Sequence, residues 1–296
     1  MTTARRCRLE SLGVSLPRRG LFRWGSVRHA VEAGKRCLAA SHYHPNDVAV
    51  LVNTGVHRDG HTCEPAIACY IQHGLDINIE FQGRRTLAFD LLNGGCGMLN
   101  ALQVLTALLT AGDAQVGMAV ASEANSDRQP DPAYTYPSTG AAVLLDLAPR
   151  RDQGFGAFVF HTHEEHADLY RSVVSLAVAR GRIRIERKAG LEEAWLSSAN
   201  AVVEEALEKE KLKREDVDLV VPSQISPGFL AKLPEKIGFA KEKVADCSGE
   251  LADTLTTSVF LALHKAREAG KLAEGKRALL LAFGSGITVG ATTYRF

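Results

Sequence analysis

Residues 87–97 constrain the fold of this chain more than any other stretch. They read LAFDLLNGGCG, and the apolar pattern MLNALQVLTALLTAG follows at once. The apolar run is typical of a buried strand, and two adjacent glycines allow a sharp turn. A long helix pattern comes next. The stretch therefore predicts a strand–turn–helix unit, which is a building block of layered α/β proteins.

Cys96 lies directly after the glycines, at the expected start of the helix. A helix N-terminus carries partial positive charge and unpaired N–H groups, and both stabilise a thiolate. We therefore expect a lowered pKa for the Cys96 thiol and a nucleophilic role. The alternative is a small buried cysteine at a strand–helix junction, because free cysteine is among the most buried residue types.

The composition limits the class of protein. The chain has 296 residues, 46% hydrophobic residues and a formal net charge of +1. Its length allows one large core or two fused domains, and its charge gives no support for a nucleic-acid partner. Its apolar runs are too short to span a bilayer, so no membrane association is expected. Residues 1–17 lack the apolar core of a secretory signal.

Six cysteines are scattered along the chain without CxxC spacing, namely Cys7, Cys37, Cys63, Cys69, Cys96 and Cys247. This distribution argues against a zinc site and against a disulfide framework. It favours a reducing, cytoplasmic setting. We expect neither a metal nor a cofactor.

Strand and helix patterns alternate along the chain and predict an α/β fold. The expected strands are residues 48–54, 86–92, 115–122, 141–147, 217–221, 277–283 and 288–296. The expected helices are residues 65–73, 98–111, 191–211 and 254–269. The segments HPNDVAVLVNT and KREDVDLVVPS echo each other, which suggests a duplicated α/β unit. We expect the halves to be residues 1–149 and 150–296.

Four segments resemble the thiolase superfamily, in particular its ketoacyl synthase III branch. They are FDLLNGGCG, STGAAVLLD, LEKEKLKREDVDLVVPSQIS and the C-terminal LLLAFGSGITVGATTYRF. The resemblance implies a thiolase-like, five-layered αβαβα fold built from two duplicated halves. It also implies an enzyme in which Cys96 takes an acyl group from a thioester.

A finer resemblance concerns residues 53–75, NTGVHRDGHTCEPAIACYIQHGL. The segment is similar to one in the head-to-head condensing enzymes of long-chain olefin biosynthesis. Those enzymes join two fatty acyl thioesters without prior decarboxylation, and a glutamate acts as a base that reaches across the dimer. The match gives this role to Glu64. The alternative for Glu64 is a first-turn helix carboxylate, favoured by the helix dipole.

The chain departs from the family at three positions. Ser223 stands where the family has its catalytic histidine, and Asp253 stands where it has its catalytic asparagine. In relatives those two side chains donate hydrogen bonds to an enolate, and each such donor typically contributes about 2.7–4 kcal/mol. Malonyl condensation is therefore not expected here. The resemblance places the oxyanion hole at the backbone N–H groups of Cys96 and Ser285, and Ser285 replaces a glycine.

A carboxylate suits the work of a general base. Asp253 or Glu64 can take a proton from an attacking hydroxyl, amine or water. The alternative for Asp253 is a helix N-cap, because it precedes TLTTSVFLALHKA. The two roles of Asp253 are compatible.

Two polar clusters are further candidates for substrate binding. The first cluster contains His161, His163 and His166. Its spacing is not typical of metal ligands and favours a solvated strand end. The alternative is that one of these histidines replaces the missing base. The second cluster contains Arg182 and Arg184. Their alternation favours an edge strand whose charged side chains prevent pairing with another chain. Their alternative role is to dock an acidic acyl carrier protein or coenzyme A phosphates.

The sequence as a whole predicts an acyltransferase of fatty acid or polyketide-type metabolism. It would take an acyl group from acyl-CoA or acyl carrier protein and pass it to a small-molecule acceptor. We expect a homodimer joined through residues 86–92, or a heterodimer with a paralogue. The alternative is a catalytically degenerate partner subunit or an acyl-carrier-binding protein, which the loss of the histidine favours.

Overall fold

Two β-sheets form the frame of the computed structural model, which describes residues 5–17, 23–79 and 85–296. The first sheet has the strand order β1-β5-β4-β2-β3, and the second has the order β6-β11-β10-β9. The strands of the first sheet are β1 Cys7–Ser15, β2 Val50–Asn53, β3 Leu87–Asp90, β4 Gly117–Glu123 and β5 Thr139–Leu147. Those of the second are β6 Gly154–Thr162, β9 Leu219–Pro222, β10 Arg277–Gly284 and β11 Thr288–Arg295. A separate hairpin pairs β7 Tyr170–Val174 with β8 Ile183–Arg187.

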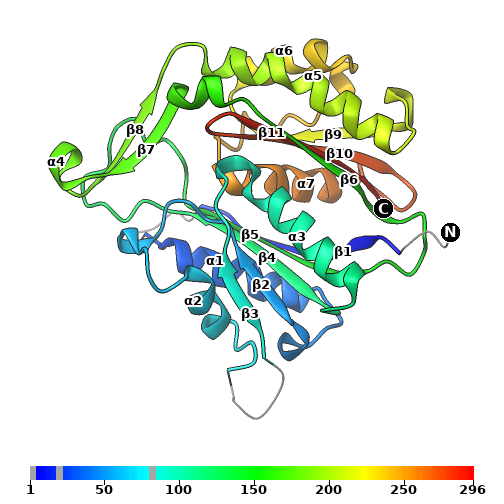
Figure 1. Cartoon of the computed structure of the whole chain (residues 1–296), viewed down its shortest axis with the longest axis horizontal. Helices are drawn as coiled ribbons and strands as arrows, with labels where there is room; N and C mark the ends of the chain where they lie inside the picture. Colours follow the sequence, from blue (N-terminus) through cyan, green and yellow to red (C-terminus); the bar gives the residue numbers. More distant parts are fainter. Residues whose placement is uncertain (1–4, 18–22, 80–84) are drawn as a thin grey trace.

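Helices cover both sheets and fill the space between them (Figure 1). The helices are α1 Ser26–Ala39, α2 Ile67–Gly74, α3 Gly97–Ala111, α4 Leu176–Ala179, α5 Leu191–Lys209, α6 Pro227–Ile237 and α7 Ser258–Glu268. Helices α3 and α7 lie between the sheets, α1 and α2 cover the first sheet, and α5 and α6 cover the second. The result is the five-layered αβαβα arrangement that the sequence predicts.

The central layer explains the most apolar helix of the chain. Residues Gly94–Ala111 are long and apolar enough, by composition alone, to cross a membrane. In the structure this helix packs between the inner faces of the two sheets, where Leu99, Leu102 and Leu105 are fully buried. Apolar contact on several sides therefore accounts for its composition.

All eleven strands and helices expected from the sequence are present, with shifted ends. Strands β1 and β7 and helices α1, α4 and α6 were not expected, and β6 and β8 were expected only as the strands of the histidine and arginine clusters. The expected helix 254–269 begins instead with a 3₁₀ turn, η7 Leu255–Thr257, and becomes α-helical only at Ser258. Leu255 causes this break, because its φ of 50° is incompatible with a regular helix.

Strand β3 forms one edge of the first sheet and pairs there with β2 alone. Leu87 at its start is 57% exposed, and Leu92 just beyond its end is 55% exposed. Large apolar side chains at an open strand edge are typical of a surface that associates with another chain.

Candidate active site

Cys96 lies in the central layer between the two sheets, next to the start of α3. It ends a 3₁₀ turn, η3 Gly94–Cys96, and directly precedes α3. A side-chain Cβ at Gly95 would lie 2.1 Å from the carbonyl oxygen of Phe283, and one at Gly284 would lie 3.3 Å from Cys96 Sγ. The turn between β10 and β11 therefore packs directly on the cysteine turn; a side chain at Gly95 would overlap it, and one at Gly284 would make a contact tighter than usual.

The Cys96 thiol is fully buried. Its Sγ lies 3.3 Å from the carbonyl oxygen of Thr288 and 3.5 Å from that of Ala282, as a donor to either. Burial raises the pKa of the Cys96 thiol to about 12, although hydrogen bonds from the backbone of Gly290 and Gly284 act in the opposite direction. The predicted lowering of this pKa is therefore wrong, because desolvation outweighs the helix terminus.

The expected oxyanion hole is only partly open. The backbone N–H of Cys96 donates to the carbonyl oxygen of Asn93 at 3.0 Å, so this donor already has a partner. In the turn after β10, the residue with positive φ is Gly286, at 99°. Ser285 is not among the described residues with positive φ, so a serine fits there without backbone strain.

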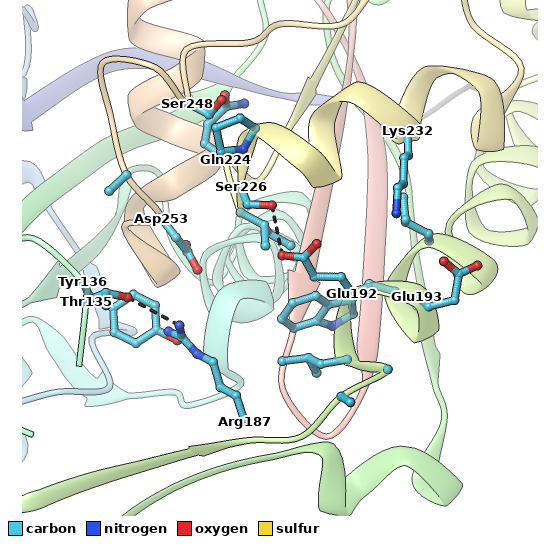
Figure 2. A pocket seen from close by; sticks show the side chains of 18 of the residues that line it. Thr135, Tyr136, Arg187, Glu192, Glu193, Gln224, Ser226, Lys232, Ser248 and Asp253 are labelled. Atoms are coloured by element: carbon cyan, nitrogen blue, oxygen red, sulfur yellow. Dashed lines mark hydrogen bonds between the residues drawn. The ribbon is translucent and has the colours of Figure 1, made fainter. Parts of the chain in front are cut away.

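A cavity of about 630 Å³ lies near this turn (Figure 2), since its lining residue Trp195 donates through Nε1 to the Gly284 carbonyl oxygen at 2.9 Å. Its walls come from the loop before β5, the start of α5, the loop after β9 and the loop before η7. Asp253 lies in the wall, and Figure 2 shows its carboxyl group facing into the cavity. The turn η7, which follows Asp253, packs against η3 and so links the cavity to the Cys96 turn.

Asp253 has the electrostatic character of a base that works near neutral pH. Burial raises the pKa of its carboxyl group to about 7, and the hydrogen bond from Leu255 and the charge of Arg187 only partly oppose that shift. The backbone N–H of Leu255 donates to Asp253 Oδ1 at 2.8 Å. The expected capping contact of Asp253 is thus present. Its donor is the N–H of Leu255, whose backbone adopts the left-handed conformation with a φ of 50°. Strained residues of this kind concentrate at functional sites.

Two cavity residues escaped the sequence analysis, namely Arg187 and Tyr136. The Arg187 guanidinium lies 5.0 Å from the centre of the Tyr136 ring, and the Tyr136 hydroxyl donates to the Tyr170 hydroxyl at 3.0 Å. Arg187 belongs to the same basic run as Arg182 and Arg184. The signal that could have selected Arg187 is its position at the end of β8, next to the start of α5.

Asp253 is the one expected site residue within the described lining of the cavity, so Cys96 and Ser285 lie outside that lining too. Ser223 is buried outside the described lining, and its Oγ accepts a hydrogen bond from the N–H of Phe283 at 3.2 Å. Glu64 is exposed near the start of α2, on the same side of the first sheet as the open β3 edge. Its role as a base that acts across a dimer stays a prediction.

The two polar clusters also lie apart from the cavity. His161 pairs with Glu205 at 2.6 Å, and His163 exchanges backbone hydrogen bonds with Ile287. Arg182 and Arg184 line a separate hollow near residues 130–132. Their roles in substrate binding stay predictions.

His166 lies near Glu165, at 4.0 Å. Within residues 5–17, 23–79 and 85–296, no group of three or more His, Cys, Asp or Glu side chains is arranged to hold a metal ion.

Comparison with known proteins gives one consistent result. Residues 207–296 match the family described as 3-oxoacyl-[acyl-carrier-protein] synthase III C terminal. The chain is 26% identical to a β-ketoacyl-[acyl-carrier-protein] synthase III of Aquifex aeolicus over 276 residues, which cover 90% of this chain and 83% of that protein. It is 27% identical to the protein of the same name from Histophilus somni, over 90% of this chain and 82% of that one.

Solved structures show the same fold. The crystal structure of the 3-oxoacyl-[acyl-carrier-protein] synthase III from Aquifex aeolicus matches with a TM-score of 0.85 and 22% identity, over 98% of this chain and 100% of that one. A variant of Xanthomonas campestris OleA with bound lauric acid and lauroyl-CoA also matches with a TM-score of 0.85, at 17% identity, over 98% of this chain and 99% of that one. The chain is therefore similar in sequence to the β-ketoacyl-[acyl-carrier-protein] synthase III proteins, matches their C-terminal family over residues 207–296, and has the same fold.

Proposed function

We propose that this protein is a cytoplasmic acyltransferase that does not decarboxylate its substrate. An acyl-CoA or acyl carrier protein thioester gives its acyl group to Cys96, and a small-molecule acceptor then takes it. The observation that carries this proposal is Asp253, a carboxyl group in the wall of a large cavity with a pKa of about 7. A group with that pKa accepts a proton efficiently at neutral pH.

The first half-reaction exchanges one thioester for another. The Cys96 sulfur bonds to the acyl carbon, the bond from that carbon to the donor sulfur breaks, and the thiol proton leaves with the donor thiol. Because the Cys96 pKa is about 12, little thiolate is present at neutral pH, and acylation should accelerate as the pH rises.

In the second half-reaction Asp253 takes the proton of the acceptor as the acceptor attacks the acyl carbon of acyl-Cys96. Asp253 then returns that proton to the Cys96 sulfur as the thioester bond breaks. The neighbouring Arg187 keeps part of the Asp253 population ionised, because its charge opposes the effect of burial on the Asp253 pKa.

Acylation of Cys96 is the direct test. After incubation with a panel of acyl thioesters, we expect intact-protein mass spectrometry to show one acyl mass and peptide mapping to place it on Cys96. Cys96→Ala should remove the mass. Cys63→Ala is the matched control, because Cys63 is exposed and lies far along the chain from the glycine turn. An acyl mass on Cys63, Cys69 or Cys247 would contradict the proposal.

A catalytically degenerate partner subunit is the second candidate. The full burial of Cys96 and the bond from its N–H to Asn93 favour that reading. The same experiment separates the two. A protein that binds an acyl carrier protein but acquires no acyl mass from any thioester is a partner subunit.

Malonyl thioesters should not be decarboxylated by the wild-type protein. Ser223 is buried outside the described cavity lining, and the ionised fraction of Asp253 repels an enolate, so neither residue supplies the donor that it replaces. The measurement is release of labelled carbon dioxide from malonyl-CoA. The double variant Ser223→His with Asp253→Asn should gain measurable release, whereas rapid release by the wild type would show that another donor is present.

Dimerisation is expected through the open edge of β3. Pairing of β3 with its twofold mate would bury Leu87 and Leu92 in one isologous interface. Leu87→Lys should therefore shift the mass measured by analytical ultracentrifugation from dimer to monomer. Leu176→Lys is the control, because Leu176 is also exposed but lies on the distant β7–β8 hairpin. A wild-type monomer at micromolar concentration would refute this interface.

A further inference from the structure

Three side chains outside the cavity form a continuous hydrogen-bonded chain. His57 Nδ1 lies 2.7 Å from Glu123 Oε2, and His57 Nε2 lies 2.9 Å from Ser172 Oγ. Glu123 ends β4, His57 follows β2, and Ser172 lies on β7. Because β2 and β4 are parallel neighbours, their carboxyl ends bring the glutamate and the histidine together. The β7–β8 hairpin then supplies the serine.

The hydrogen bonds of Glu123 settle which nitrogen of His57 carries the proton. Glu123 accepts from the backbone N–H groups of Val56 and His57 at 3.1 and 3.0 Å, and from the Thr256 hydroxyl at 2.7 Å. A carboxylate with three such donors acts as an acceptor toward His57 as well. Nδ1–H therefore donates to Glu123, and in the neutral ring Nε2 accepts from the Ser172 hydroxyl.

Burial along this chain runs from inside to outside. Glu123 is 0% exposed and His57 is 4% exposed, while Ser172 is exposed. A serine hydroxyl on the surface, a buried histidine that accepts its proton and a fully buried carboxylate that orients the histidine are the three parts of a serine-hydrolase triad. Such triads are recognised by geometry and roles on many unrelated folds.

Tyr134 adds an independent feature. Its ring contacts the His57 ring edge to face, with centroids 4.9 Å apart, and its buried hydroxyl oxygen has no hydrogen-bond partner among the residues that the structure describes. Burial raises the pKa of Tyr134 well above its usual value, so the hydroxyl keeps its proton as a donor. An unused donor beside the histidine suits an oxygen that gains negative charge during a reaction.

We propose that Ser172, His57 and Glu123 form a second acyl site, independent of Cys96, which cleaves carboxylic esters or thioesters. Ser172 is the nucleophile, His57 is the general base and acid, Glu123 orients His57, and Tyr134 donates to the oxyanion. Val174 follows on the same face of β7 and is 49% exposed, so an apolar acyl group has a surface to lie against.

The reaction at this site balances without any further reactant except water. Ser172 Oγ bonds to the acyl carbon while its proton moves to His57 Nε2, and the carbonyl electron pair moves to the oxygen. The bond to the leaving group then breaks, and the leaving group takes the proton from His57. Water repeats the sequence on acyl-Ser172, and the products are a carboxylic acid and an alcohol or thiol.

The test uses an alkyl fluorophosphonate, which reacts with activated serines, and p-nitrophenyl butyrate as an ester substrate. We expect the adduct on Ser172 by peptide mapping, and no adduct in Ser172→Ala. His57→Gln should slow labelling and hydrolysis by about 10²–10⁴-fold, which is the usual contribution of a positioned base. Tyr134→Phe should lower hydrolysis by about 10²–10³-fold, as expected for one oxyanion donor.

Controls make each outcome decisive. Ser126→Ala should label normally, because Ser126 is exposed and its Oγ bonds to the N–H of Gly60 and to no histidine in the described structure. Cys96→Ala removes the other acyl site and should leave the adduct on Ser172, so failure of one site does not imply failure of the other. If His57→Gln does not fold, the adduct on Ser172 in the wild type and its loss in Ser172→Ala still test the site. Absence of an adduct on Ser172, or equal labelling in a folded His57→Gln variant, would overturn the proposal.

Discussion

Asp253→Asn is expected to lower the rate of acyl transfer by about 10²–10⁴-fold while acyl-Cys96 accumulates. Asparagine keeps the shape of the side chain and can still accept the Leu255 N–H, so the η7 turn should persist. It cannot take a proton from the acceptor. The measurement is single-turnover kinetics with a preloaded acyl-enzyme.

The pH dependence of this variant supplies a second readout. In the wild type, transfer should rise with pH through about 7, as Asp253 loses its proton, and the variant should lack that rise. The folded pKa lies above the ordinary value of 3.8, so the folded state binds the proton more tightly than the unfolded state does. Wild-type stability should therefore fall as the pH rises between about 3.8 and about 7, and the variant should lose less.

Glu64→Gln distinguishes the two carboxylates. If Asp253 is the base, Glu64→Gln should leave transfer from a preloaded acyl-enzyme close to the wild-type rate. If Glu64→Gln stops transfer and Asp253→Asn does not, the base is Glu64 of the partner subunit, as the olefin-pathway resemblance implies. If neither change affects transfer, the base must be sought among His161, His163 and His166.

Gly95→Ala is expected to have the largest structural effect. The new Cβ would lie 2.1 Å from the carbonyl oxygen of Phe283, and neither backbone can give way without opening the packed turns. Forced overpacking of this kind typically costs about 1–3 kcal/mol. We expect a lower melting temperature and loss of acylation at Cys96, since the cysteine is the next residue. Gly249→Ala is the control, because a Cβ there meets no atom within 4 Å; equal effects of the two changes would refute this reason.

The sequence predicted the buried strands well because their apolar runs are local signals. It missed α1 because the residues that begin this helix depend on a distant side chain. The N–H groups of Ser26 and Val27 donate to the carboxylate of Asp59, at 2.6 and 3.2 Å. Helix α2 also begins on a distant carboxylate, that of Asp90 at the end of β3, but the sequence did predict this helix, as residues 65–73. Caps that come from elsewhere in the fold leave no start signal in the helix itself.

The candidate site shows the same limit. The position of Cys96 was readable from the glycine turn, but its pKa was not, because burial is a property of the packed β10–β11 turn and not of the helix start. Asp253 was selected from its place in the sequence, and its raised pKa again depends on the surrounding cavity wall. Arg187 and the pair of His57 with Glu123 are brought to their partners only by sheet topology.

The Tyr136 ring contacts one residue of each proposed site, which would link the two sites thermodynamically. One neighbour is the His57 ring, stacked at 5.6 Å between centroids, and another is the Arg187 guanidinium at 5.0 Å. An anionic ligand that draws Arg187 away from the Tyr136 ring would change the electrostatic field at His57. A change in the charge of His57 would in turn change the strength of the contact between Arg187 and the Tyr136 ring. Such coupling is reciprocal. If a ligand in the cavity changes the binding free energy of a ligand at the ester site, the ester-site ligand changes the binding free energy in the cavity by the same amount.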